Sequence, residues 1–294
     1  MQWKIKVDFP FDWKLKLKFA ILPERPTPCI IKGMKWMRSI ELANRKVPVI
    51  VTGKSSTIVF YSINLKERER KFIENAIKKL LGIEDATNLY KFMEEDAVLR
   101  KIKERLYGFG KAGLMSISIY EGVIKAIVQQ QISLKVAENI IANIVEKFGD
   151  RVFFMNEYVY DFPSPNILSH ASIQQLRNCG LSLRKAEYIK EFSKEVMKGF
   201  DVEKLRDRKP DEIIETLRQF RGIGRWTAEL VMVASMGLNI LPADDLGVRK
   251  AISHFYFNDE LQTPEVIRKF TEEKFGEHMR DVIVYLLMAY RMGL

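Results

Sequence analysis

Apolar and polar residues alternate with a period of two near the start of the chain. The pattern covers residues 3–7 and 13–19, where lysines separate the apolar side chains, and it indicates strands with one solvent-facing side. Two β-rich runs then flank Thr52-Gly53-Lys54-Ser55-Ser56, a segment typical of a hairpin connection. We therefore predict a small antiparallel sheet within residues 1–65, with strands at 3–7, 13–19, 47–51 and 57–63.

From residue 66 onward the apolar positions follow the 3.6-residue period of an α-helix. The first such segment, 66–82, is predicted to end at Gly82 and to bury one face made of Phe72, Ile73, Ala76, Ile77, Leu80 and Leu81. Further helices are predicted at 96–106, 119–130, 133–147, 182–198, 210–218, 225–236, 245–256, 263–274 and 278–292. The expected fold class is α+β, with an antiparallel β domain plus its amphipathic helix at 1–85 and a helical domain at 86–294.

Composition narrows the class of protein. The chain has 294 residues, a length that suggests two domains, and 47% hydrophobic residues, which suffices for a packed core. Lysine and arginine number 48 against 38 acidic residues, for a net charge of +10. This excess favours a polyanionic partner, nucleic acid first. A lysine-rich intracellular surface without such a partner would give the same balance.

Several kinds of site and location are excluded by the residues present. Cys29 and Cys179 cannot supply four thiolates, so an all-cysteine zinc site, an iron–sulfur cluster and a disulfide framework are ruled out. The three histidines lie far apart, and we expect no metal site. The first 19 residues carry charges throughout, unlike a signal peptide, and no apolar run reaches 18 residues. We expect a cytoplasmic protein without membrane contact.

The most informative segment is IETLRQFRGIGRWTAEL, residues 214–230. We predict a helix ending at Phe220, a tight turn at Gly222-Ile223-Gly224 with Ile223 tucked between the helices, and a second helix from Arg225. Two glycines one residue apart permit a positive φ and a close backbone approach. The N–H groups at the start of the second helix would then suit an anion such as a DNA phosphate. A simple corner between two helices, closed by glycine, accounts for the same residues.

An acidic residue follows the second helix of this hairpin. Asp245 stands where the helix at 245–256 needs an N-cap, because its carboxylate can accept backbone N–H groups there. Most aspartates in such a place are structural caps. Asp245 lies 21 residues after Gly224, about one helix and one return loop away, and it can therefore face a ligand held at the hairpin.

These segments together resemble the helix-hairpin-helix (HhH-GPD) superfamily of DNA glycosylases, and within it the 3-methyladenine DNA glycosylase II (AlkA-type) branch. The resemblance spans essentially the whole chain and is strongest over 119–256. It implies a small N-terminal antiparallel β domain and a two-lobed all-α core, with the helix-hairpin-helix at about 210–236. The segments that carry it are Gly222–Ala228, Pro242–Asp245, Gly122–Ser133, Phe162–Pro165 and Gly180–Ala186.

The resemblance assigns chemistry to two residues. Asp245 matches the family's catalytic aspartate, which stabilises the cationic sugar as the base leaves; the spacing of the residues after it favours Asp245 over Asp244. Bifunctional relatives carry a lysine where this chain has Trp226, so no Schiff base is expected and the enzyme should be monofunctional. The indole of Trp226 is expected to receive a cationic alkylated purine such as 3-methyladenine. Core packing against the hairpin is the alternative role for this ring.

Further residues are expected to contact substrate or DNA. Gln131 matches the side chain that enters the minor groove, where relatives often carry an apolar wedge; a polar residue could instead hydrogen-bond the widowed base. A merely polar helix end at 129–131 is the alternative. Pocket lining is expected for Tyr285 and Arg291, with a favourable C-terminal helix charge as the other interpretation of Arg291. Arg221 would contact a phosphate or lie in solvent. The predicted DNA contacts are Gln130, Gln131, Ser133, Gly222, Gly224, Arg225 and Thr227.

The resemblance also implies a partner and a cofactor state. The partner is double-stranded damaged DNA in base excision repair, bound by a monomer that leaves an abasic site and is nucleoid-associated when on DNA. No cofactor is expected, apart from a structural Na⁺ or K⁺ at the carbonyl groups of Phe220 and Ile223. Two alternatives stay open: a non-catalytic helix-hairpin-helix DNA-binding protein, and a glycosylase for another lesion such as hypoxanthine.

Overall fold

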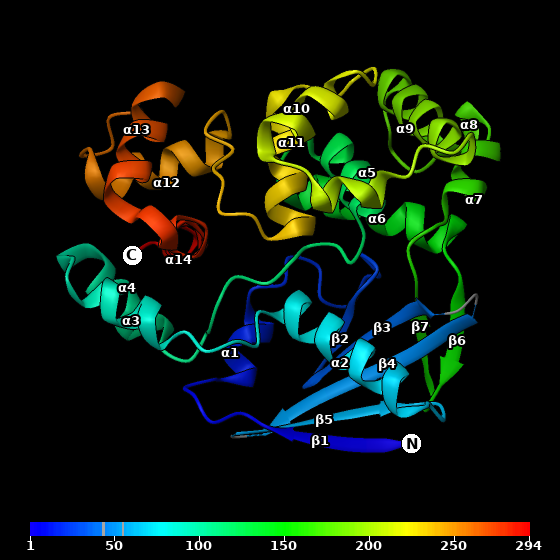
Figure 1. Cartoon of the computed structure of the whole chain (residues 1–294), viewed down its shortest axis with the longest axis horizontal. Coiled ribbons are helices and arrows are strands. Elements are labelled where there is room, and N and C mark those ends of the chain that lie inside the picture. The colour runs from blue at the N-terminus through cyan, green and yellow to red at the C-terminus, as the bar shows by residue number, and fades with distance from the viewer. Residues whose placement is uncertain (43–44, 55) are drawn as a thin grey trace.

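The computed structural model describes residues 1–42, 45–54 and 56–294. A five-stranded sheet forms one end of the molecule and two groups of helices form the other (Figure 1). The α+β fold expected from the sequence is confirmed. The strands are β1 Gln2–Lys6, β2 Ile30–Lys32, β3 Lys35–Leu42, β4 Arg45–Lys54, β5 Thr57–Ser62, β6 Arg151–Phe154 and β7 Glu157–Tyr160. The α-helices are α1 Trp13–Lys18, α2 Glu67–Leu81, α3 Thr87–Glu94, α4 Ala97–Leu106, α5 Ile119–Gln129, α6 Leu134–Phe148, α7 Pro165–His170, α8 Ile173–Arg177, α9 Leu183–Met197, α10 Pro210–Arg218, α11 Arg225–Val231, α12 Leu246–Tyr256, α13 Pro264–Phe275 and α14 Met279–Met292.

The sheet has the strand order β1-β5-β4-β3-β2, with every neighbouring pair antiparallel. One face packs on α1 and α2, and the other packs on the short β6–β7 hairpin through Met37, Ile50 and Val159. The strands predicted at 3–7, 47–51 and 57–63 are confirmed. Strand β4 continues to Lys54, further than expected, and Ser55 of the predicted connection lies outside the described residues.

Residues 13–19 form a helix and not the predicted strand. The carboxylate of Asp12 accepts the backbone N–H of Leu15 at 2.9 Å, which caps α1. Trp13 and Leu17 lie four residues apart and face the sheet, while Leu15 and Phe19, also four apart, contact the helical region. An alternating pattern therefore arose from a helix buried on two sides, because each apolar side covers a different core.

Helix α2 confirms the segment predicted at 66–82, and Gly82 ends it with a left-handed φ of 57°. Its buried side chains include Ile73, Ile77, Leu80 and Leu81. Phe72, expected on the same face, is instead 50% exposed. The residue lies one position before Ile73 and is turned about 100° away from it around the helix axis, which carries its ring to the edge of the buried face.

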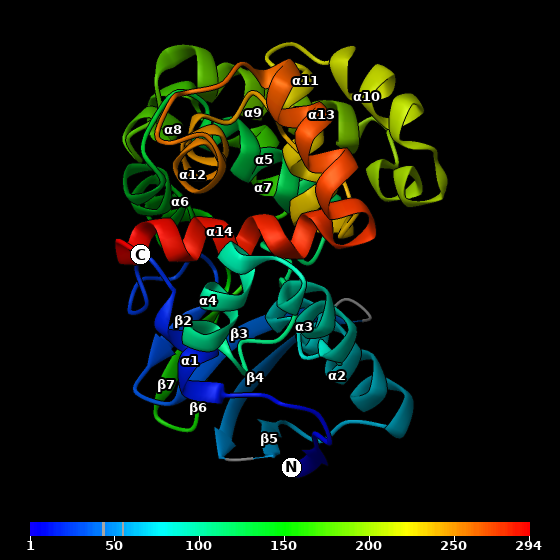
Figure 2. The ribbon, with the colours of Figure 1, turned by 90° about the vertical axis from the view of Figure 1, so that its left-hand side faces the viewer.

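The helices form two lobes with separate hydrophobic cores. One core comprises residues of α5–α11, and the other combines α3 and α4 with α12–α14. Helix α14 crosses the molecule between α12 and α13 above and α4 below (Figure 2). The predicted helices are confirmed with ends that shift by a few residues; the segment at 225–236 is α11 followed by a π-helical turn, Met232–Met236. Strands β2, β3, β6 and β7 and helices α3, α7 and α8 were not predicted.

A buried ion cluster joins the sheet to helix α5. The Arg38 guanidinium on β3 lies 2.6 Å from a carboxylate oxygen of Glu121, and Lys125 lies 2.7 Å from the other oxygen. All three side chains are at most 7% exposed. Burial opposes the charge of Glu121, but the two cations outweigh it and hold the pKa of Glu121 below its ordinary value. The cluster fixes the first turn of α5 against the β domain.

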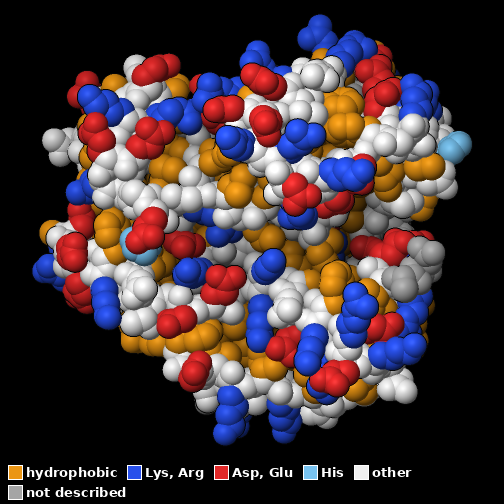
Figure 3. All heavy atoms as spheres, in the orientation of Figure 1, with side chains coloured by type: hydrophobic (Ala, Val, Ile, Leu, Met, Phe, Trp, Pro, Cys, Tyr) orange, Lys and Arg blue, Asp and Glu red, His pale blue; other side chains and the backbone are white. Residues whose placement is uncertain are grey.

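The surface shows no sorting of charge by sign on the face seen in Figure 3, where cationic and anionic side chains are interspersed. The net charge of +10 is therefore not gathered into one basic patch on that face. Among the described residues, no helix combines the length and the apolar character needed to cross a membrane.

Candidate functional site

The predicted hairpin is formed by α10 and α11, with a turn between Arg218 and Arg225. Ile223 is 5% exposed and packs in the core of the first lobe, as the sequence predicts. Gly222 has a φ of +84°, and a Cβ added to it would lie 2.1 Å from the ring of Tyr188 on α9. This glycine is therefore required both by its backbone conformation and by its close contact with an aromatic ring.

Gly224 differs from Gly222. Its φ of −95° and ψ of −179° are extended, so no left-handed conformation is needed. A Cβ added to Gly224 would have no described atom within 4 Å. The residue is exposed and precedes the first turn of α11, where backbone N–H groups lack partners within the helix. The turn is thus open on the side where a ligand could approach the backbone.

Asp245 and Trp226 lie together. Asp245 caps α12, because one of its carboxylate oxygens accepts the N–H of Val248 at 3.0 Å. The indole Nε1–H of Trp226 donates to the other oxygen at 3.3 Å. Both side chains are partly exposed, and Val248 is buried. A carboxylate with both oxygens engaged has a defined orientation at the surface.

This pair bridges the two lobes. Trp226 belongs to α11 in the first lobe, and Asp245 begins α12 in the second. A buried carboxylate joins α11 to α13 of the second lobe as well: Glu229 of α11 is 1% exposed and lies 2.9 Å from Arg225 and 3.1 Å from Arg268 of α13. Arg225 and Glu229 are spaced for a helical ion pair. Arg268 is distant from them in the sequence, and no sequence pattern indicated that it would pair with Glu229.

The two residues expected from α14 have different environments. Arg291 is an exposed residue; desolvation of its guanidinium by the surrounding protein lowers its pKa, and the negative charge of Asp245 opposes that shift. Tyr285 is fully buried, with its hydroxyl 2.8 Å from the carbonyl oxygen of Gly110 and 3.2 Å from the hydroxyl of Tyr90. The prediction that Tyr285 lines the pocket is wrong, because the packing of α14 on α4 places its ring inside the second core.

Comparison with known proteins agrees with this arrangement. Residues 124–277 match the HhH-GPD superfamily base excision DNA repair protein family, and residues 2–85 match the AfAlkA-like, TATA-box binding protein-like domain. The first match spans more than half of the chain. The chain belongs to the HhH-GPD superfamily.

Several relatives of this HhH-GPD protein are known individually. A solved 3-methyladenine DNA-glycosylase from Archaeoglobus fulgidus is 44% identical, with 99% of each chain covered and a TM-score of 0.93. DNA-3-methyladenine glycosylase 1 of Schizosaccharomyces pombe is 29% identical over 52% of this chain and 64% of its own. DNA-3-methyladenine glycosylase 2 of Escherichia coli is 26% identical over 53% and 52%, respectively. The chain thus spans between about half and two thirds of the two curated relatives. These similarities identify a DNA glycosylase of base excision repair.

Two predicted DNA contacts of this glycosylase are used inside the protein. The side-chain nitrogen of Gln130 donates to the carbonyl oxygen of Gly222 at 2.8 Å and to the hydroxyl of Thr227 at 3.0 Å. Thr227 is 2% exposed, so its side chain does not reach a surface where DNA could bind. A DNA contact by the side chain of Thr227 is thereby contradicted, because the first turn of α11 packs this side chain against the end of α5; a contact through its backbone N–H stays a prediction.

The neighbouring candidates are exposed. Gln131 has a φ of +55°, uncommon for a residue with a side chain. Ser133 caps α6 by accepting the N–H of Val136 at 3.4 Å, and its hydroxyl proton is left free to donate. Arg221 is exposed to solvent, one of its two expected environments, and it also lies 3.3 Å from Glu191 and 3.5 Å from Glu187 of α9.

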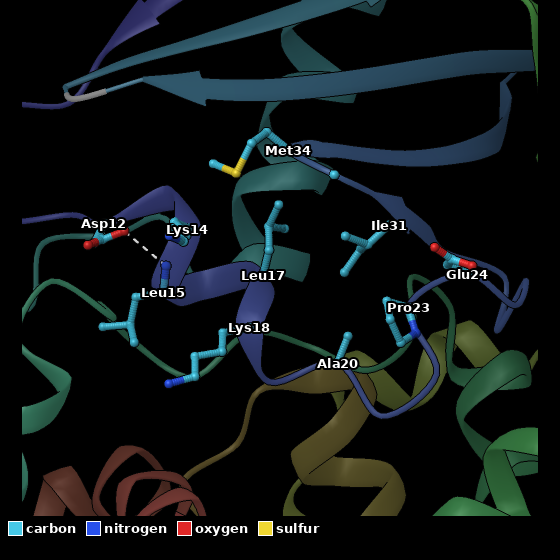
Figure 4. Close-up of a pocket in the computed structure, with 11 residues that line it drawn as sticks. Asp12, Lys14, Leu15, Leu17, Lys18, Ala20, Pro23, Glu24, Ile31 and Met34 are labelled. Carbon is cyan, nitrogen blue, oxygen red and sulfur yellow. Dashed lines mark hydrogen bonds between the residues drawn. The ribbon is translucent and has the colours of Figure 1, made fainter.

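Neither of the two cavities described in the structure contains the Asp245–Trp226 pair. One, of about 580 Å³, lies between α1 and the turn after β2, with Leu15, Leu17 and Ile31 in its wall (Figure 4). The other, of about 600 Å³, lies between β3 and the start of α5. In the described ranges no three His, Cys, Asp or Glu side chains gather as metal ligands would. The candidate site is therefore defined by the pair at the junction of the lobes.

Proposed function

We propose that this glycosylase is monofunctional, excises alkylated cationic purines such as 3-methyladenine from double-stranded DNA, and leaves an abasic site. The observation that carries the proposal is the hydrogen bond between Trp226 and Asp245 at the junction of the lobes. It brings an indole and a carboxylate from two helices to one surface beside the hairpin turn. The Archaeoglobus relative, named a 3-methyladenine DNA-glycosylase, supports the choice of substrate.

Asp245 would act on the sugar. Breaking the bond between a base and C1′ leaves positive charge on the deoxyribose, and a fixed carboxylate beside C1′ stabilises that charge in the transition state. The N–H groups of Val248 and Trp226 hold the carboxylate in place, so little reorganisation is required as the charge develops. Attack of water on the cationic sugar then completes the reaction.

Trp226 would act on the base. Its N–H lies in the ring plane and points at Asp245, so this hydrogen bond uses the edge of the ring and neither of its two π faces. A purine alkylated at N3 or N7 is cationic, and contact with an indole face is worth about 0.5–2 kcal/mol. Family resemblance places an attacking lysine at this position in bifunctional glycosylases. An indole has no amine to form a Schiff base, which supports hydrolysis without strand cleavage.

DNA would lie against the open side of the hairpin. Backbone N–H groups after Gly224 suit a phosphate at the start of α11, and Arg225 is exposed beside them. Gln131 would fill the space left by the flipped nucleotide, with Ser133 on the adjacent backbone. Arg291 would line the base pocket near Asp245.

A monovalent cation and a monomeric state complete the proposal. The carbonyl oxygen of Phe220 already accepts the N–H of Ile223, and a carbonyl has a second lone pair. This lone pair and the Ile223 carbonyl would hold Na⁺ or K⁺ and thereby stiffen the turn.

Size-exclusion chromatography with light scattering, with and without a DNA duplex, tests for one protein molecule per duplex.

The test is release of modified base from N-methylated duplex DNA. We expect the wild-type protein to release free methylpurine and to leave heat-labile abasic sites. Asp245→Asn should slow release about 100-fold or more, the order of effect seen when one preorganised electrostatic group is removed, with DNA binding retained. Asp244→Asn is the matched control, because Asp244 is an exposed neighbour and its substitution removes the same charge.

Each competing function has its own result. Binding to DNA with no release of any base would identify a non-catalytic hairpin protein. Release of hypoxanthine but not of methylpurines would replace the proposed substrate. A covalent protein–DNA adduct trapped by borohydride would contradict the monofunctional assignment. Equal rates for the Asp245→Asn and Asp244→Asn proteins would remove Asp245 from the mechanism.

A further inference from the structure

The side chain of Gln130 hydrogen-bonds the connection between α5 and α6 to the hairpin. Gln130 follows the last residue of α5, and its amide nitrogen donates to Gly222 at 2.8 Å and to Thr227 at 3.0 Å. These two acceptors lie on either side of Gly224. Gln130 therefore spans the turn that would hold a phosphate, and the next residue in the chain is Gln131.

A second side chain, from α9, also hydrogen-bonds the connection between α5 and α6. The ammonium of Lys185 on α9 donates to the carbonyl oxygens of Val128 and Gln130, at 2.8 Å and 2.6 Å. These acceptors belong to the C-terminal end of α5, where carbonyl groups lack partners within the helix. Partial burial lowers the pKa of Lys185, which agrees with its half-buried position against the connection.

Helix α9 supports the hairpin as well. The ring of Tyr188, three residues after Lys185, lies against Gly222, and Arg221 makes ion pairs with Glu187 and Glu191 of the same helix. One helix thus carries both the turn and the end of α5. The φ of +55° at Gln131 is energetically unfavourable for a residue with a side chain, and the hydrogen bonds of Gln130 and Lys185 fix the backbone just before it.

We infer that Gln130 is a positioning residue that couples the phosphate-binding turn to Gln131. The turn that binds the DNA backbone and the side chain that fills the space of the flipped nucleotide are thereby held in one rigid geometry. The inference rests on the proposed function and adds a role for Gln130 that is distinct from DNA contact. A phosphate bound at the turn fixes the position of the DNA relative to Gly222. Because Gln130 is hydrogen-bonded to Gly222, the position of the next residue, Gln131, is fixed relative to the DNA as well. Without the link, the turn still binds DNA but Gln131 is no longer held at the flipped site.

The experiment compares two duplexes of one sequence, one undamaged and one with a tetrahydrofuran abasic-site analogue, each with 2-aminopurine beside the central position. Fluorescence anisotropy gives the ratio of the two dissociation constants, and 2-aminopurine emission reports unstacking. For Gln130→Met we expect the preference for the abasic duplex to fall about tenfold, equivalent to about 1.4 kcal/mol and in the range of one to two hydrogen bonds. Affinity for undamaged DNA should change less than about twofold, and the rise in emission should be lost at saturation.

Matched variants separate positioning from loss of structure. Thr227→Val removes one acceptor of Gln130 without changing the size of a buried side chain, and should lower the preference in part, whereas Thr227→Ser keeps the hydroxyl and should behave as wild type. Gln219→Met makes the same chemical change at an exposed residue at the end of α10 and should leave the preference unaltered. Thermal unfolding of each variant checks that the fold is retained.

The outcomes distinguish this inference from the proposed function. A wild-type protein that shows no preference for the abasic duplex would contradict the proposed flipping itself. A wild-type preference that persists in folded Gln130→Met and Thr227→Val proteins would overturn the role of Gln130 alone. A loss of affinity that is equal on both duplexes would also overturn it, because that result describes a general DNA contact.

Discussion

Replacing Trp226 separates its two proposed roles, the hydrogen bond to Asp245 and the contact with a cationic base. Trp226→Phe keeps an aromatic face but removes the N–H that lies 3.3 Å from the carboxylate. That distance is long for a hydrogen bond and the pair is partly exposed, so we assign it about 1 kcal/mol, the ordinary net value. Excision should slow about fivefold, equally for a cationic and a neutral base.

Trp226→Leu removes the aromatic face as well. A contact between an indole and a cation is worth about 0.5–2 kcal/mol, so the further loss should be about 2- to 30-fold and confined to the cationic base. The assay is the single-turnover excision rate on duplexes that contain one 7-methylguanine or one hypoxanthine. Trp3→Phe is the control, because Trp3 is buried in the sheet and its Nε1 has no hydrogen-bond partner among the described residues.

Two results would refute this reasoning. An excision rate for Trp226→Phe equal to that of wild type would show that the indole N–H does not hold Asp245 in the reacting complex. Equal further losses on both bases in Trp226→Leu would show that the ring contributes shape and not attraction for positive charge. A loss of similar size in Trp3→Phe would trace the effect to stability.

Two further predictions concern stability. Glu121→Gln leaves Arg38 buried without its closest counter-charge and should lower the free energy of unfolding by about 3–5 kcal/mol in guanidinium titrations. The control, Glu74→Gln, affects a partly exposed helical ion pair and should cost less than about 0.5 kcal/mol. Similar costs for the two variants would contradict a buried ion cluster. The second prediction concerns Asp96. Partial burial opposes its charge, but hydrogen bonds from Lys274 and the backbone outweigh burial and lower the pKa of Asp96. The stabilisation of the folded protein by this carboxylate is therefore complete above about pH 4 and is lost as the pH falls through the lowered pKa. Asp96→Asn should flatten the pH dependence of stability below about pH 4, and an unchanged profile would contradict this assignment.

The hairpin and its acid could be located from the sequence because their signals are local. Glycine at a turn, the apolar period on each side and an aspartate ahead of a helix each concern a few consecutive residues. The structure confirms the two helices, the burial of Ile223 and the cap at Asp245. The roles of Asp245 and Trp226 in catalysis stay predictions, but their spatial proximity, which those roles require, is observed.

The errors share a different cause. The side chains of Tyr285 and Thr227 were expected at a surface and are buried. In each case the environment is set by an element distant in the sequence, which periodicity does not identify. The strand expected at 13–19 failed for a related reason, because α1 lies between two cores and each core selects its own side chains.

The residues in order were sufficient to establish the class of fold, the position of most helices, the hairpin turn and the residue types available for chemistry, since caps, glycines and apolar periods act over one or two turns of chain. They were not sufficient to establish that α3 and α4 join the C-terminal helices in one lobe, that Arg38 meets Glu121, or which side chains stay open to DNA. Those features depend on burial between segments that are far apart along the chain, and the free energy of such contacts exists only once the lobes and the sheet have packed together.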